Sequence, residues 1–105
     1  MTAADVIAGL KRAPVAVSAG GLDLLVKPWT AKTRAEFATW REANPGPGSI
    51  AAKVFQVSVC DAAGALLFAD VSIEEINELD GAAVEVIADR VMALSGLGKS
   101  DPGNS

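Results

Sequence analysis

The chain contains 105 residues with a formal net charge of −4, and it has no histidine and one cysteine. A chain of this length holds one domain, the missing histidine excludes imidazole bases and histidine metal ligands, and a single cysteine excludes an internal disulfide or a cysteine-built zinc site. We therefore expect a protein that is not an enzyme and that uses no cofactor or metal.

The first predicted element is a short helix near the N-terminus. Thr2 can cap it, with Asp5 in the first turn, and Pro14 prevents its continuation. The helical spacing places three apolar residues on one face, namely Val6, Ile7 and Leu10.

A β-hairpin is predicted next. Two short β-like runs, residues 15–19 and 22–27, flank the pair Gly20-Gly21. Paired glycines between such runs are typical of a tight hairpin turn. Pro28 cannot donate a ladder hydrogen bond, so it closes the second strand or lies at its edge.

A second helix is predicted to begin at Thr30 or Thr33. Residues 33–36, with the sequence TRAE, fit a capping box, in which the hydroxyl and the glutamate each satisfy a free backbone N–H. Phe37 and Trp40 lie three residues apart and so share one face. The loop of residues 44–48, rich in proline and glycine, ends this helix.

Residues 49–60 fit two patterns. The first is a helical spacing, which relates Ile50, Val54 and Val57. The second is the alternation of a strand, in which Phe55, Val57 and Val59 are the apolar residues. Ser49 as a cap and the pair Ala51-Ala52 favour a mostly buried helix over a strand.

The segment after Cys60 contains a turn and a short helix. Residues 61–64, with the sequence DAAG, predict a type I turn, and residues 66–68 predict a short extended segment. Ser72 followed by Glu75 completes a capping box for a helix over 73–79. A hydrophobic staple is formed by Val71 and Ile76.

The last helix begins after its cap, Asp80, and ends at Gly96 and Gly98. Its apolar stripe is formed by Val84, Ile87, Val91 and Leu94. Residues 98–105 have nothing to bury and are expected to form a disordered tail. The elements together predict a small single α+β domain over residues 1–97, with an N-terminal hairpin packed with four to five helices.

No set of side chains suggests catalysis. Cys60 has no histidine to activate it and is expected to be a core or near-core thiol. The acidic residues Glu74, Glu75 and Glu78 are interpreted as a solvated face, because no third ligand type accompanies them. Trp29 and Trp40 are either core residues or binding anchors, and Trp29 is the better candidate for exposure because it follows a strand end.

The charge is divided unevenly along the chain. Residues 1–48 carry six bases and four acids, a net +2, whereas residues 49–105 carry three bases and nine acids, a net −6. Eight of those acids lie from Asp61 to Asp89, where there is no base. Such a surface repels phosphates, so we expect no nucleic-acid partner. It is either a solvated face or a docking face for a basic partner.

A membrane partner is not expected. No apolar run approaches the roughly 20 residues that a membrane span needs, and the N-terminus lacks the layout of a signal peptide. We expect a soluble, cytoplasmic protein.

Over roughly residues 8–97 the order of features resembles the small tail assembly chaperones of long-tailed bacteriophages and prophages. The family's typical string is an apolar segment followed by Asp-x-x-Gly, two residues, Phe and an acidic helix start. The same order is followed here by Asp61, Gly64, Phe68 and Asp70, with three residues instead of two between Gly64 and Phe68. Further similarity lies in the segments LKRAP (10–14), LVKPWT (25–30) and VSVCDAAG (57–64). The loop at 45–48 departs from the family pattern, which leaves partner specificity open.

The resemblance implies a non-enzymatic chaperone that binds the tape measure protein and recruits tail tube subunits in the host cytoplasm. It also implies a longer form made by a −1 ribosomal frameshift, and the pair Gly98-Lys99 is one that slippery codons can encode. Partner contacts are expected at Trp29, Trp40, Phe68 and Ile76. The alternatives are a structural tail-terminator or head–tail component and a small bacterial adaptor protein.

Overall fold

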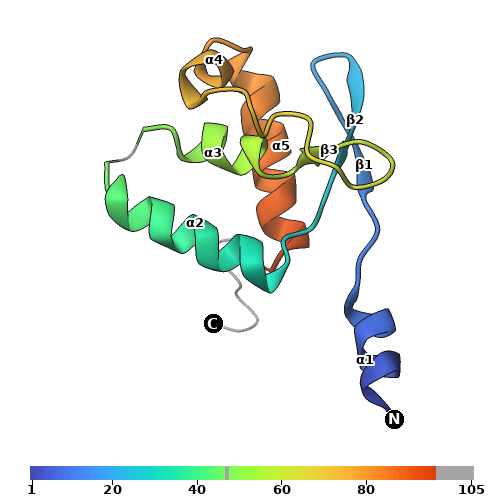
Figure 1. The fold of residues 1–105 in the computed structure, drawn as a ribbon. Coiled ribbons are helices and arrows are strands. Elements are labelled where there is room, and N and C mark those ends of the chain that lie inside the picture. Colours follow the sequence, from blue (N-terminus) through green and yellow to red (C-terminus); the bar gives the residue numbers. More distant parts are fainter. Residues whose placement is uncertain (47, 97–105) are drawn as a thin grey trace.

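The computed structural model describes residues 1–46 and 48–96 and contains a three-stranded antiparallel sheet with five helices (Figure 1). The elements are α1 (Ala3–Leu10), β1 (Val15–Ala19), β2 (Leu22–Val26), α2 (Ala31–Ala43), α3 (Ile50–Gln56), β3 (Val59–Cys60), α4 (Ile73–Asn77) and α5 (Gly81–Leu94). This confirms the predicted α+β class and the N-terminal hairpin. The expected tail at 98–105, with Gly98 as a helix end, lies outside the described residues.

The sheet has the order β1-β2-β3, so β2 is its central strand. The hairpin register runs from Val15 opposite Val26 to Ala19 opposite Leu22. Both turn residues have positive φ angles, 59° at Gly20 and 80° at Gly21. A two-residue turn of this kind matches the natural twist of the strands, which is why the glycine pair predicted the hairpin correctly.

The ambiguous segment 49–60 forms both structures in succession. A helix covers α3, and the chain then becomes strand β3, so the prediction of a single helix is wrong for the last residues. The strand forms because the second edge of β2 offers free backbone groups, and Val59 and Cys60 pair there with Val26 and Leu25. The backbone N–H of Lys27 extends this pairing by donating to the carbonyl of Ser58 at 2.8 Å.

Three of the predicted helix starts are confirmed by hydrogen bonds. The Thr2 side chain caps α1, and Asp5 completes a reciprocal capping box with it. Ser72 accepts from the N–H of Glu75 at the start of α4, without the reciprocal bond, and α4 ends at Asn77 rather than at residue 79. Asp80 accepts from the N–H of Ala83 at 2.9 Å and so caps α5.

At two other helix starts the prediction is only partly confirmed. The second helix is capped by Thr30, because that residue has the extended backbone that a cap requires, so the capping box predicted at 33–36 is wrong. Thr33 instead donates its N–H to the Thr30 hydroxyl at 3.2 Å. Ser49 precedes α3 as predicted, but its backbone is left-handed (φ 69°) and its side chain caps nothing.

The predicted turn after Cys60 is present. The N–H of Gly64 donates to the carbonyl of Asp61 at 2.9 Å, and the Asp61 carboxylate also accepts from the N–H groups of Ala63 and Ala65. The extended segment expected at 66–68 is reduced to one residue, Leu66, which bridges to Cys60. Bends follow at 67 and 68, because the chain must turn toward the start of α4.

The core lies where α3 and α5 pack together and where α5 meets β1 (Figure 1). Fully buried positions at its centre are Val26, Val54, Val59, Ile76, Ile87 and Val91. The expected stripe of α5 is confirmed, with its last member, Leu94, half-buried. Cys60 is buried, as the sequence predicted. No helix within residues 1–46 and 48–96 is long and apolar enough to cross a membrane.

Helix α1 stands apart from the rest of the domain (Figure 1). None of its residues is buried, and its apolar face is open to solvent, with exposed fractions of 41% for Val6, 56% for Ile7 and 76% for Leu10. Only the linker after α1 is tied down, because the guanidinium of Arg12 donates to the carbonyl of Leu94 at the end of α5.

Candidate functional site

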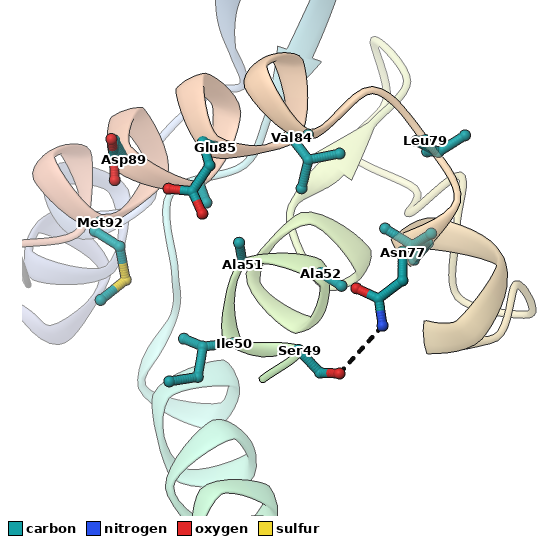
Figure 2. A pocket seen from close by; sticks show the side chains of 13 residues that line it. Ser49, Ile50, Ala51, Ala52, Asn77, Leu79, Val84, Glu85, Asp89 and Met92 are labelled. Carbon is teal, nitrogen blue, oxygen red and sulfur yellow. Dashed lines mark hydrogen bonds between the residues drawn. The ribbon is translucent and has the colours of Figure 1, made fainter. Parts of the chain in front are cut away.

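A groove of about 600 Å³ runs between α3 and α5 and ends against α4 (Figure 2). Its lining comprises Ser49, Ile50, Ala51, Ala52, Ile76, Asn77, Leu79, Gly81, Val84, Glu85, Ala88, Asp89 and Met92. This volume falls within the range of roughly 300–1,000 Å³ that is common for binding pockets in proteins. It is therefore the best candidate for a binding site in the described part of the chain.

The helical period of α5 places its lining residues in one row. Gly81, Val84, Ala88 and Met92 recur at spacings of three or four residues, which puts them on one side of the helix. On the opposite wall, α3 contributes Ile50 and two alanines. The groove stays hollow because the side chains of Ala51, Ala52 and Ala88 are single methyl groups, which are too small to fill the space between the helices.

One edge of the groove is acidic. Glu85 and Asp89 lie four residues apart on α5, both exposed, and the close view shows the Glu85 side chain directed toward Ala51 (Figure 2). They belong to the segment from 61 to 89 that contains acids and no base. The groove thus combines an apolar floor with a negatively charged edge, which suits an amphipathic, basic binding partner.

A side-chain hydrogen bond connects the end of α4 to the residue before α3, at one end of the groove. The amide of Asn77, at the end of α4, donates to the hydroxyl of Ser49 at 3.2 Å (Figure 2). The Ser49 hydroxyl thus bonds a side chain at the end of α4 instead of a backbone N–H of α3. The bond also links the wall formed by α3 to the short helix that closes the groove.

Of the four residues expected to contact a partner, only Ile76 lies in the groove. It is 1% exposed, so its side chain forms the floor and leaves almost no surface for direct contact. The other three lie elsewhere. Phe68 packs edge-on against Phe55, with ring centroids 4.9 Å apart. The structure therefore does not bring the four residues into one site.

Both tryptophans contact Phe37. Trp29 has its ring centroid 4.9 Å from that of Phe37 and is half-buried against the core, although its place after a strand end favoured exposure. The ring centroid of Trp40 lies 5.7 Å from that of Phe37, and the ammonium of Lys53 is 5.6 Å from the Trp40 ring centroid. These contacts form an aromatic cluster against α2, separate from the groove.

The thiol of Cys60 is buried and lies next to a carboxylate. Burial raises the pKa of the Cys60 thiol above its ordinary value, and the adjacent Asp61 carboxylate raises the pKa further, against a smaller opposing effect of Lys27. A thiol of this kind is a poor nucleophile at neutral pH. Among residues 1–46 and 48–96, no three acidic or cysteine side chains are grouped so that they could hold a metal ion.

The sequence reasoning missed most of the groove. Glu85 and Asp89 are among the eight acids of the segment 61–89, but nothing local indicates that the surface beside them is hollow. The one available signal was the pair Ala51-Ala52 in a segment otherwise rich in large apolar residues. Small residues facing a neighbouring helix leave space that a larger side chain would fill.

Comparisons of the chain with models of known protein families, with curated proteins and with solved structures found no match.

Proposed function

We propose that the protein is a tail assembly chaperone of a long-tailed phage or prophage, which binds the tape measure protein and helps to recruit tail tube subunits. The proposal starts from the sequence resemblance around Asp61, Gly64 and Phe68. It is supported by one structural observation, the groove between α3 and α5. A groove with an apolar floor is a common way to hold an amphipathic helix, and a helical client needs such a surface to stay soluble.

The charge of the groove supports binding to a client helix with a basic side. Glu85 and Asp89 border the apolar floor on α5. Charges at the edge of an interface mainly speed association and select among partners, while the apolar floor contributes most of the binding free energy. The remaining acids between residues 61 and 89 would keep the complex in solution.

Co-expression with the tape measure and tail tube proteins of the same phage genome tests the proposal. We expect the tape measure protein to become soluble and to co-purify with the chaperone. The double variant Glu85→Lys/Asp89→Lys should weaken this binding by about tenfold or more, since both rim charges then repel a basic helix.

A matched control separates the groove from overall charge. Glu36→Lys/Glu42→Lys changes the net charge by the same amount at two exposed positions outside the groove, and it should leave binding unchanged. Lack of co-purification and no gain in tape measure solubility would refute the chaperone role. Presence of the protein in purified particles would favour a structural tail component instead.

The proposed longer form has a separate genetic test. Its slippery codons would encode Gly98-Lys99, which lies outside the described residues. A −1 open reading frame that continues beyond these codons is expected. Codons that cannot re-pair after the slip, or an immediate stop in that frame, would remove the frameshift from the proposal without affecting the groove.

A further inference from the structure

Helix α1 has an apolar face that no residue within 1–46 and 48–96 covers. Val6, Ile7 and Leu10 point from one side of the helix, and all three are exposed. The helix has eight residues, and isolated helices shorter than about 12–15 residues are only marginally stable in water. Its capping box helps, but a helix of this length needs packing on its apolar face to persist.

The groove between α3 and α5 offers a surface of matching chemistry. Its floor is apolar, and its edge carries Glu85 and Asp89. Helix α1 presents three aliphatic side chains and is followed at once by Lys11, which is exposed. The basic character comes from the residues directly after the helix, because α1 itself carries one acid, Asp5, and no base, whereas Lys11 and Arg12 follow it.

We propose that α1 of one molecule binds in the groove between α3 and α5 of a second copy of the same chain. Val6, Ile7 and Leu10 would cover the apolar floor, and Lys11 would lie near the acidic edge. The inference uses the same groove as the proposed function but does not depend on the identity of the client. A client helix would compete with α1 for this site.

The short, anchored linker after α1 disfavours binding of α1 to the groove of its own chain, which is why we place it in the groove of a second molecule. Residues 11–14 separate α1 from β1, and four residues reach at most about 14 Å when fully extended. The side chain of Arg12 also holds this linker at the carbonyl of Leu94. Figure 1 shows α1 directed away from α3 and α4, so binding within one chain would require the linker to detach and turn back.

Two kinds of assembly are compatible with this contact, a closed dimer and a chain or ring of molecules. If two molecules each insert α1 into the other, the contact closes as a dimer. If each molecule inserts α1 into the next, the contact generates a longer chain or a ring. Either arrangement removes α1 from solvent.

Sedimentation or light scattering of the purified protein alone is the first test. The wild-type protein should have a mass that is a multiple of the monomer mass and that depends on concentration. Ile7→Asp should shift the protein to monomer, weakening association by about tenfold or more, and should leave the fold intact because α1 contains no buried residue. Val86→Asp, an equivalent change on the exposed side of α5 outside the groove, should leave the association unchanged.

Disulfide trapping shows which molecule supplies the groove. Ile7→Cys and Glu85→Cys are made in separate chains, mixed and oxidised, while the native Cys60 stays buried. A disulfide between the two variant chains supports the proposal. The double variant in one chain should then also cross-link between molecules at high concentration.

Three results would overturn the inference. A wild-type protein that remains monomeric at its highest soluble concentration would do so, as would association that persists in Ile7→Asp. A disulfide formed only within one chain would place α1 in its own groove. None of these results bears on client binding, which is measured by co-purification, so the two proposals fail separately.

Discussion

The indole Nε1 of Trp29 donates a 2.7 Å hydrogen bond to the hydroxyl of Ser58, which is completely buried. The backbone N–H of Trp29 also donates to the Ser95 hydroxyl at 2.9 Å. One residue therefore connects the segment before β3 to the end of α5. In the described part of the chain every buried side-chain polar atom has a partner, and this bond provides one for Ser58.

Replacing Trp29 with phenylalanine should destabilise the protein by about 1–3 kcal/mol, because the buried Ser58 hydroxyl loses its indole partner. Urea unfolding followed by circular dichroism measures this change. Trp40→Phe is the control, since Trp40 is half-buried and contacts Phe37 and Lys53 through its ring, and its effect should be smaller. If Ser58→Ala in the Trp29→Phe background costs as much as in the wild type, the hydrogen bond is not the cause.

Ile76 should act through stability rather than through direct contact with a partner. It is 1% exposed, so Ile76→Ala should cost about 2–5 kcal/mol in the free energy of unfolding. Leu79 also lines the groove but is 43% exposed, so Leu79→Ala should cost much less and instead weaken binding to a client or to α1. Equal losses of stability for the two variants would contradict this assignment.

Two substitutions in the hairpin turn separate the cost of backbone strain from the cost of a steric contact. A Cβ on Gly20 would lie 3.2 Å from the Cβ of Ala83, whereas a Cβ on Gly21 would meet nothing within 4 Å. Both residues have positive φ, so either change to alanine should cost about 1–2 kcal/mol. Thermal unfolding should show a larger loss for Gly20→Ala. Gly21→Asn should be tolerated best, because asparagine accepts the left-handed conformation.

Alkaline pH should destabilise the fold through Cys60. Burial raises the pKa of this thiol above its ordinary value of 9.0, so the folded protein keeps the proton at pH values where the unfolded chain has lost it. The stabilisation is complete below the unfolded pKa and is lost as the pH rises through the folded pKa. Urea titrations between pH 8 and pH 10 should show this decline (roughly spanning the ordinary thiol pKa). Cys60→Ala should have a flatter profile, and identical profiles would exclude the thiol as the cause.

The parts of the fold that could be predicted are those encoded locally. Thr2, Ser72 and Asp80 were recognised as caps because a cap depends on its own side chain and an N–H three residues later. The Gly20-Gly21 turn was recognised because the turn type itself requires those residues. The class and the order of elements followed from these signals.

The parts that could not be predicted depend on contacts distant in sequence. Strand β3 exists because β2 has a free edge, which the sequence of residues 49–60 does not reveal. The groove depends on which sides of α3 and α5 face each other, and on Ala88 lying opposite Ala51 and Ala52. Large aromatic side chains are a common sequence signal of a binding site, whereas this hollow surface results from small side chains.

The bond from Arg12 to the carbonyl of Leu94 brings together two positions that are far apart in the sequence. The chain before β1 and the end of α5 thus lie within the length of one arginine side chain. Proteins with neighbouring ends tolerate circular permutation. A short loop could join residue 96 to β1, with the new ends opened in the exposed segment 44–46. The resulting domain would lack α1 and retain the sheet, the core and the groove.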